Sequence, residues 1–351
     1  MHRDFKLNGV SFDDVDALID YSKNISDSVY GFLISWFDAN EFVEVKTSGS
    51  TGKPKLIRLK KQHMKNSAVA TGAFFNVKEN TTALLCLSAD YIAGKMMLVR
   101  SLTLGWHIDV VESVSNPLSK TDKDYDFSAM VPMQLQKSLS EIHRVKKLIV
   151  GGGVVSQSLI HKIQNIKTEV FATYGMTETI THIAVKKLNQ FSSKALSSSS
   201  VVEEEFYKIL PNIKIYIDSR SCLVIEAPKL SDELVVTNDV VALISDKQFQ
   251  WIGRYDNVIN SGGVKLHPEK IEKELAKTIS NRFFIIGIPD EILGEKLVLI
   301  IEGKEKEINF NNFNLSKYEI PKKIFFLNEF NLTKTGKIHR KNTLNSLNNF
   351  K

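Results

Sequence analysis

The sequence of 351 residues has little cysteine and no long apolar run. Its two cysteines, Cys86 and Cys222, form no CxxC pair, which excludes a disulfide framework and fits a reducing, cytoplasmic setting. No apolar run approaches the ~20 residues that a membrane-spanning helix needs. The N-terminal segment MHRDFKLNGVSFDD lacks the apolar core of a signal peptide. We therefore expect a cytoplasmic protein without a membrane span.

The chain also lacks a concentrated basic region. It has 46 Lys and Arg against 40 Asp and Glu, a net charge of +6, but these residues are spread along the sequence. A nucleic-acid-binding protein would gather them in a stripe with aromatic side chains for stacking, so we expect no nucleic acid partner. The mild positive charge suits small phosphate-rich ligands. The length allows about two domains of roughly 150 residues each.

Short apolar runs alternate with helical patterns over residues 1–255, which predicts an α/β domain with parallel strands. The strands are expected at Phe42–Lys46, Leu56–Leu59, Leu84–Leu87, Lys147–Val150 and Thr168–Ala172, and the helices at Lys61–Phe75 and Ser156–Asn165. Residues 256–351 read as a smaller α+β domain. Its helix is expected at Pro268–Ile279 and its strands at Phe283–Ile288 and Leu297–Ile301.

A loop of glycine and hydroxyl residues between two predicted strands is the most informative segment. It consists of Thr47, Ser48, Gly49, Ser50, Thr51, Gly52, Lys53, Pro54 and Lys55. Glycines allow a tight turn in which several N–H groups converge on one anion, and the two lysines add positive charge. The loop differs from a Walker A motif because its glycines are closer together and Pro54 follows Lys53. It predicts polyphosphate binding; the alternative is a flexible surface loop.

The segment Ser48–Lys55 resembles the phosphate loop of the adenylate-forming superfamily, which contains acyl-CoA synthetases, peptide-synthetase adenylation domains and luciferases. Four further segments resemble motifs of this superfamily in the same order: Tyr174–Thr179, Thr237–Asp239, Gly253–Asn257 with Ser261–Gly263, and Thr333–Lys337. The resemblance covers residues ~45–340. It implies a large α/β domain (1–255) with a small mobile α+β domain (256–351), and a carboxylic acid activated by ATP and Mg²⁺ as an acyl-adenylate. Coenzyme A is the implied co-substrate.

The resemblance also implies roles for single residues. Tyr174, Gly175 and Met176 would bind ATP together with the phosphate loop. Thr177 would contact the α-phosphate, and Glu178 would hold Mg²⁺, which prefers hard oxygen ligands. The alternative for Glu178 is a glutamate in the first turn of a helix after a threonine cap.

Three further residues complete the implied ATP site. Asp239 would accept from the ribose hydroxyls, and Arg254 would lie near the ribose or the phosphates. Lys337 would be the catalytic cation that bridges the substrate carboxylate and the α-phosphate. The alternatives are a turn residue for Asp239 and a solvated lysine for Lys337. Three positions depart from the superfamily. Asn238 replaces a glycine, Asn331 replaces a proline, and Tyr91 or Ile92 lies about where many relatives have a histidine.

The segment after the large domain resembles a hinge. Asp256 matches the position about which the small domain rotates between adenylate formation and thioester formation. Gly262 and Gly263 would then line the path of the thiol. An ordinary interdomain turn is the alternative for this segment.

The acid substrate is suggested by the length of the chain and by one arginine. The phosphate loop begins at Ser48, so the large domain looks shortened at its N-terminus, as in short o-succinylbenzoate–CoA ligases of menaquinone biosynthesis. Arg100 would bind the second carboxylate of this acid bidentately; a surface arginine at a helix end is the alternative. The remaining acyl-site candidates are Gly151, Gly152, Thr181 and His182. A strand-to-helix turn is the alternative for the glycines, and a structural histidine for His182.

Three other functions stay open on the sequence. The chain could be another acyl-CoA or aryl-CoA synthetase, or a stand-alone adenylation enzyme that loads a carrier protein. A nucleotide-binding pseudoenzyme is the non-enzymatic alternative, although Glu178, Asp239 and Lys337 are all present. The sequence is compatible with a homodimer.

Overall fold

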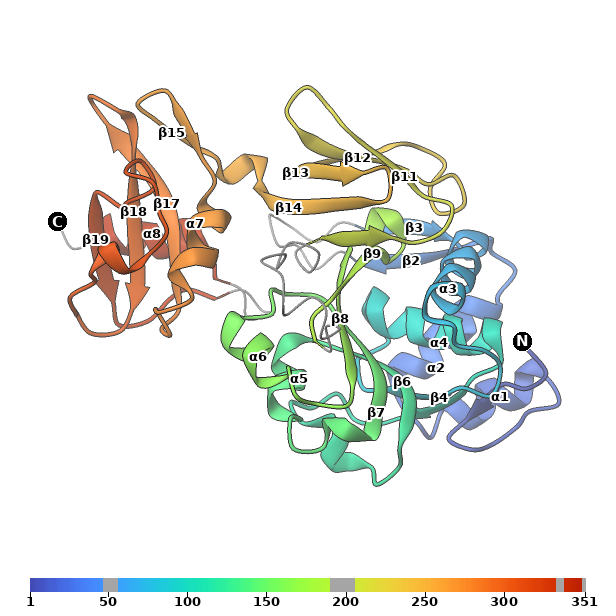
Figure 1. Ribbon diagram of the computed structural model, residues 1–351. Coiled ribbons are helices and arrows are strands. Elements are labelled where there is room, and N and C mark those ends of the chain that lie inside the picture. The colour runs from blue at the N-terminus through green and yellow to red at the C-terminus, as the bar shows by residue number, and fades with distance from the viewer. Residues whose placement is uncertain (47–55, 190–205, 333–337, 349–351) are drawn as a thin grey trace.

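A computed structural model describes residues 1–46, 56–189, 206–332 and 338–348 (Figure 1). Most of the strands belong to two sheets. A 12-stranded sheet is built from strands that end by residue 254, and a five-stranded sheet follows it in the chain. The chain passes from one to the other through a short 3₁₀ turn, Tyr255–Asn257. None of the helices in these described ranges is both long and apolar enough to cross a bilayer.

One half of the large sheet is parallel and the other half is antiparallel. The parallel half has the order β1-β5-β4-β6-β7-β8. Its strands are β1 (Lys6–Leu7), β4 (Thr82–Leu85), β5 (His107–Val110), β6 (Tyr125–Met130), β7 (Val145–Val150) and β8 (Glu169–Gly175). The antiparallel half continues as β9-β10-β14-β13-β12-β11. Its strands are β9 (His182–Lys187), β10 (Tyr207–Ile209), β11 (Lys214–Ile217), β12 (Cys222–Glu226), β13 (Val235–Ser245) and β14 (Gln248–Arg254).

Helices cover both faces of the parallel half. Because successive side chains of a strand point to opposite faces, Leu84 and Leu148 pack into one core while Leu85 and Ile149 pack into another. The first core includes residues of α5 (Pro132–Lys137) and α6 (Gln157–Lys162). The second includes residues of α1 (Val15–Ser22), α2 (Asp27–Phe37), α3 (Lys61–Phe75) and α4 (Ile92–Leu104).

The five-stranded sheet has cores of its own. Its strands are β15 (Ile259–Ser261), β16 (Val264–Leu266), β17 (Phe283–Asp290), β18 (Gly294–Glu302) and β19 (Lys323–Leu327), and its helices are α7 (Pro268–Leu275) and α8 (Arg340–Asn348). The buried residues of its two clusters all come from positions 259–330. A separate hairpin pairs β2 (Phe42–Lys46) with β3 (Leu56–Lys60), with Lys46 opposite Leu56.

The predicted α/β class with parallel strands, followed by a smaller α+β part, is confirmed. The helix Lys61–Phe75 has the predicted bounds. Four elements are shorter or shifted. The strands predicted at Leu84–Leu87 and Thr168–Ala172 lie at Thr82–Leu85 and Glu169–Gly175, and the helices predicted to reach Asn165 and Ile279 end at Lys162 and Leu275. β4 ends before Cys86, whose carbonyl accepts from the side chain of Gln134, 48 residues along the chain, instead of from a neighbouring strand. Beyond both helices the chain continues as turns.

Candidate functional site

Several predicted site residues lie where β7 and β8 end. Gly151 and Gly152 follow β7 directly, while Tyr174 and Gly175 are the last residues of β8. The two strands are parallel neighbours, so their carboxyl ends meet at one edge of the sheet. A Cβ atom on Gly151 would stand 2.6 Å from Oγ1 of Thr173, and Gly152 has a φ of +77°. The predicted turn of small residues is therefore tightly packed against β8.

Tyr174 connects the central motif to the strand that carries Asp239. Its hydroxyl donates to Oδ2 of Asp239 at 2.7 Å, across 65 residues of sequence. Its ring packs edge-on against Phe249, at a centroid distance of 5.1 Å, and against Tyr207 at 5.7 Å. Burial and the adjacent Asp239 carboxylate raise the pKa of Tyr174, so its hydroxyl stays protonated and remains a donor.

The residues after β8 form a 3₁₀ turn, Thr177–Thr179, and not an α-helix. Glu178 lies in the first turn of this single-turn 3₁₀ helix, and its N-cap is Met176 instead of the threonine that the alternative required. Thr179 is buried and its Oγ1 accepts from the backbone N–H of Met176 at 3.1 Å, which closes the turn. Thr177 is half-buried and Glu178 is exposed.

The backbone bends sharply at Ile180, between the 3₁₀ turn and β9. Ile180 has φ 68° and ψ −61°, and the N–H of Thr181 donates to the carbonyl of Thr179 at 2.8 Å. These values describe a γ-turn, which is a strained conformation for a β-branched residue. The bend returns the chain onto β8, where a Cβ atom on Gly175 would lie 2.1 Å from the carbonyl oxygen of Thr181. The motif residues and the acyl-site candidates Thr181 and His182 are thereby brought together.

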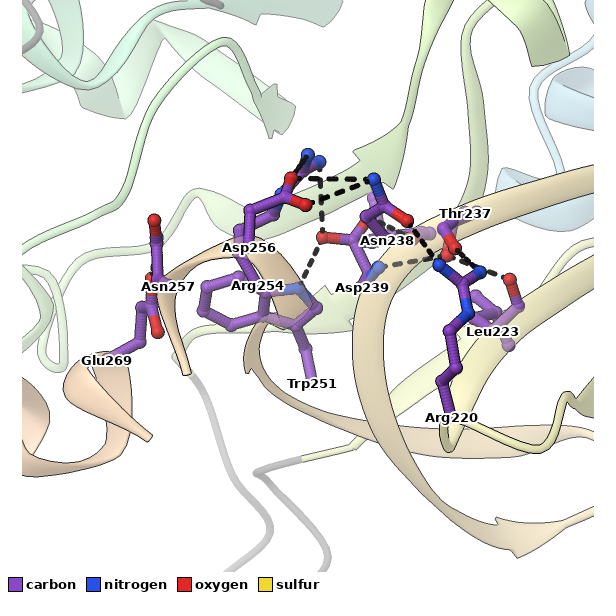
Figure 2. A network of polar contacts seen from close by, with 11 residues as sticks. Arg220, Leu223, Thr237, Asn238, Asp239, Trp251, Arg254, Asp256, Asn257 and Glu269 are labelled. Carbon is purple, nitrogen blue, oxygen red and sulfur yellow. Dashed lines mark hydrogen bonds and ion pairs between the residues drawn. The ribbon is translucent and has the colours of Figure 1, made fainter. Parts of the chain in front are cut away.

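Asp239 is the centre of a polar network between β13 and β14 (Figure 2). Asp239 is buried, with 7% of the residue exposed. Besides the Tyr174 hydroxyl, it accepts from Nε1 of Trp251 at 3.1 Å, and Nη1 of Arg254 lies 3.8 Å from Oδ1. Asp239 is therefore a strand residue held by three side chains, which contradicts the alternative of a turn residue.

Asn238, the residue next to Asp239, connects the predicted hinge to the large sheet. Its amide nitrogen lies 3.3 and 3.4 Å from the carboxylate oxygens of Asp256, and its carbonyl oxygen accepts from Nη1 of Arg220 at 2.8 Å (Figure 2). Asp256 also pairs with Arg254 at 2.9 Å. The departure from glycine at position 238 thus supplies a side chain that contacts the predicted hinge residue.

Arg100 is buried inside helix α4, with 1% of its surface exposed. The surface alternative for this residue is wrong. Its contacts are long: Nε lies 3.4 Å from Oγ1 of Thr71 and Nη1 lies 3.6 Å from the sulfur of Met97. Its Nη2 atom has no hydrogen-bond partner among the described residues. Burial lowers the pKa of Arg100 to about 9, so the guanidinium is still charged at neutral pH.

His182 lies beside this buried cation at the start of β9. The residue is 3% exposed, and Nε2 lies 3.5 Å from Oγ1 of Thr71. Burial, followed by the charge of Arg100, holds the pKa of His182 well below its usual value of 6.5. The imidazole is neutral at pH 7, so Arg100 alone carries positive charge in this cluster of Thr71, Arg100 and His182. One turn before Thr71 in α3, the buried Oγ of Ser67 also lacks a partner among the described residues.

Gly262 and Gly263 form the two-residue turn between β15 and β16. Both have positive φ values, 58° and 81°, which is the geometry of a type I′ hairpin turn. They belong to the five-stranded sheet and are separated in the chain from the Asp239 network by the turn at Tyr255–Asn257. The phosphate loop Thr47–Lys55 and Lys337 lie outside the described residues. Leu332 and Ile338, which flank the lysine segment, form an antiparallel bridge.

Three features of the site had no signal in the sequence. The indole of Trp251 reaches Asp239, the side chain of Asn238 joins Arg220 to Asp256, and the backbone is strained at Ile180. The described residues contain no group of three or more His, Cys, Asp or Glu side chains that could hold a metal ion by themselves.

The chain is similar to known proteins both in sequence and in fold. Residues 46–221 match the model of the family described as AMP-binding enzyme. The chain is 25% identical over 327 residues to a 2-succinylbenzoate–CoA ligase of Lactococcus lactis, covering 85% of this chain and 70% of the relative. The corresponding ligase of Listeria monocytogenes is also 25% identical, with coverage of 93% and 75%.

Two solved structures have a similar fold. An acyl-CoA synthetase (AMP-forming)/AMP-acid ligase II-like protein from Dyadobacter fermentans is 38% identical, with a TM-score of 0.62, and covers 94% of this chain and 98% of its own. O-succinylbenzoate coenzyme A synthetase from Bacillus subtilis, solved with ATP and a magnesium ion, has a TM-score of 0.72 at 21% identity. It is matched over 86% of this chain and 69% of its own length.

Proposed function

Because this chain belongs to the family of AMP-binding enzymes, we propose that it is an AMP-forming acid–CoA ligase whose acid is o-succinylbenzoate. The observation that carries the choice of acid is Arg100, a buried cation whose Nη2 lacks a partner among the described residues. A buried charge is normally paired. A dicarboxylic substrate supplies the missing anion, and relatives named 2-succinylbenzoate–CoA ligase support this acid.

The reaction has two steps. In the first, an oxygen of the substrate carboxylate attacks the α-phosphorus of ATP, and the bond to pyrophosphate breaks to give the acyl-adenylate. In the second, the thiolate of coenzyme A attacks the acyl carbon, and AMP leaves with the electron pair of the acyl–oxygen bond. Both reactants of the first step are anions, so positioned cations must offset their repulsion. Lys337 and the lysines of the loop Thr47–Lys55 are the proposed cations.

Each described residue of the nucleotide site has a proposed role in this reaction. Asp239 accepts from the ribose hydroxyls, and Arg254 lies beside the ribose or the phosphates. Tyr174, Gly175 and Met176 border the nucleotide, while Thr177 contacts the α-phosphate. The exposed carboxylate of Glu178 fits a Mg²⁺ ion, which takes one or two protein carboxylates together with substrate phosphates. The ion would neutralise charge on the phosphates.

The acyl group is assigned to the cluster around Arg100. Arg100 binds the carboxylate that does not react, and the neutral His182 and Thr181 border the same group. Gly151 and Gly152 allow the backbone after β7 to approach it. We further propose two domains, 1–255 and 256–351, that rotate about Asp256 and bring Gly262 and Gly263 to the thiol.

A product assay over a panel of carboxylic acids tests this function. With ATP, Mg²⁺ and coenzyme A, o-succinylbenzoate should give AMP, pyrophosphate and the CoA thioester, at higher kcat/KM than fatty or plain benzoic acids. Formation of ADP and phosphate would reject the acyl-adenylate mechanism. Acyl-adenylate without any CoA thioester would indicate a carrier-protein enzyme, preference for another acid would identify another synthetase, and ATP binding without turnover would identify a pseudoenzyme.

A further inference from the structure

Strand β14 contains a bulge that changes the direction of one side chain. In the ladder between β13 and β14, Asp239 pairs with Arg254 and Val240 with Gly253, but Val241 pairs with Trp251. Ile252 is therefore an extra residue on β14. In a regular strand, Trp251 and Arg254 would point to opposite faces because they are three residues apart. The bulge lets both approach Asp239, and bulges that redirect a side chain are common beside active sites.

The indole of Trp251 then forms a direct contact with the Asp239 carboxylate. Nε1 donates to Oδ1 at 3.1 Å (Figure 2). The Tyr174 hydroxyl donates to Oδ2 at 2.7 Å. One donor on each oxygen fixes the plane of the carboxylate. The ring of Trp251 is half-buried and packs against the core of the large sheet, so the donor itself is held in place.

We propose that Trp251 is a positioning residue for nucleotide recognition, which acts by orienting Asp239 towards the two ribose hydroxyls. This inference rests on the proposed function, in which Asp239 accepts from the ribose. An ionised carboxylate offers about four lone-pair sites. Trp251 and Tyr174 occupy two of them, whereas Arg254 lies 3.8 Å from Oδ1, beyond hydrogen-bond distance. The remaining two match the pair of neighbouring hydroxyls of a ribose. A carboxylate already oriented for this pair loses less freedom when the nucleotide binds.

Nucleotides that lack one ribose hydroxyl provide the test. The dissociation constants of ATP, 2′-deoxy-ATP and 3′-deoxy-ATP are measured by calorimetry for the wild-type chain and for Trp251→Phe. In the wild type, loss of a hydroxyl that donates to a carboxylate should weaken binding at least about tenfold. Trp251→Phe should weaken ATP binding about tenfold. In this variant, the dissociation constants of the deoxynucleotides should exceed that of ATP by less than about threefold.

A matched control separates positioning from loss of an aromatic ring. Trp106 is fully buried, and its Nε1 has no hydrogen-bond partner among the described residues. Trp106→Phe should lower the free energy of unfolding through altered packing. It should keep the wild-type ratio between the dissociation constants of the deoxynucleotides and that of ATP. If Trp251→Phe weakened all three nucleotides by the same factor, its role would be structural and the proposal would be overturned.

A measurement on the wild-type chain removes the dependence on a folded variant. With ¹⁵N-labelled tryptophan, the chain gives three indole N–H resonances, from Trp36, Trp106 and Trp251. The resonance of Trp251 should shift on addition of ATP and shift less with either deoxynucleotide. Equal shifts for all three nucleotides would overturn the proposal.

The outcomes also distinguish this inference from the proposed function. A wild-type chain that discriminates among the nucleotides, with a Trp251→Phe variant that discriminates equally, would reject Trp251 and keep Asp239 as the ribose ligand. A wild-type chain that binds ATP and 2′- and 3′-deoxy-ATP equally would reject the ribose contact of Asp239 and the role of Trp251 together. No ATP binding at all would reject the proposed function itself.

Discussion

Replacing Arg100 with methionine should lower activity on o-succinylbenzoate without lowering the free energy of unfolding. Arg100 is 1% exposed, and at neutral pH its guanidinium is charged because its lowered pKa, about 9, is still above 7. A buried charge without a partner destabilises a fold by roughly 3–5 kcal/mol, and apolar replacement of buried charged groups has stabilised proteins by about 1–4 kcal/mol. Methionine fills similar space with a flexible apolar chain. The free energy of unfolding of Arg100→Met should therefore equal or exceed that of the wild type.

The same substitution should remove the contact to the second carboxylate of the substrate. A buried charge-assisted contact is worth about 2–3 kcal/mol, so kcat/KM for o-succinylbenzoate should fall about a hundredfold. An analogue that lacks this carboxylate makes no such contact. Its kcat/KM should change less than about threefold, since the variant loses nothing that this analogue uses.

The assay combines steady-state kinetics on both acids with urea denaturation. Arg144 offers a matched control, because its guanidinium is partly buried but donates to the backbone carbonyls of Leu118 and Thr121. Arg144→Met should lower stability by leaving these carbonyls unpaired and should keep the ratio of kcat/KM between the two acids.

Two results would refute this reasoning about Arg100. The first is a clear loss of stability in Arg100→Met, which would mean that the guanidinium has a stabilising anionic partner within the protein. The second is an equal loss of kcat/KM for both acids, which would make Arg100 a structural residue of the acyl pocket.

Three further predictions concern other parts of the site. His182 is held neutral in the folded chain, so at low pH the unfolded chain takes up a proton that the folded chain does not. The free energy of unfolding should therefore fall as pH drops below about 6.5, by up to about 1.4 kcal/mol per pH unit. His182→Gln should reduce this slope when the free energy is measured by urea titration at several pH values. Lys337→Ala should slow adenylate formation ~10²–10³-fold in single-turnover assays but spare thioester formation from pre-made acyl-adenylate; equal loss in both steps would contradict its role. Asp256→Pro should reduce thioester formation and spare adenylation, because proline fixes φ. The control is Asp256→Ala, which loses the same contacts to Arg254 and Asn238 but keeps φ free, and it should retain both steps.

The strand and helix pattern was largely predictable because local periodicity determines it. The helix Lys61–Phe75 is an example, since its buried residues Met64, Ala68, Thr71 and Phe75 recur at helical spacing. Element ends were less predictable where a distant side chain decides them. The end of β4 depends on Gln134, which lies 48 residues from the Cys86 carbonyl that it contacts.

The site was predictable only in the positions that the resemblance supplied. Burial of Arg100 depends on the packing of α3 against α4, and the sequence alone left a surface position open. The contact of Trp251 with Asp239 depends on one extra residue in a strand ladder, and a regular alternation would have turned Trp251 away. Such register shifts arise from the pairing between strands and cannot be predicted from the sequence of either strand alone.

The separate cores of the two sheets have a spectroscopic consequence. All three tryptophans, at positions 36, 106 and 251, belong to the part of the chain that builds the 12-stranded sheet, and the part after residue 255 contains none. Intrinsic tryptophan fluorescence therefore reports unfolding of the large sheet and is silent about the small one, whereas circular dichroism reports both. If the two cores melt independently, the two methods will give different midpoints for the same sample. A melting temperature measured by tryptophan fluorescence would then describe only the part of the chain that builds the 12-stranded sheet.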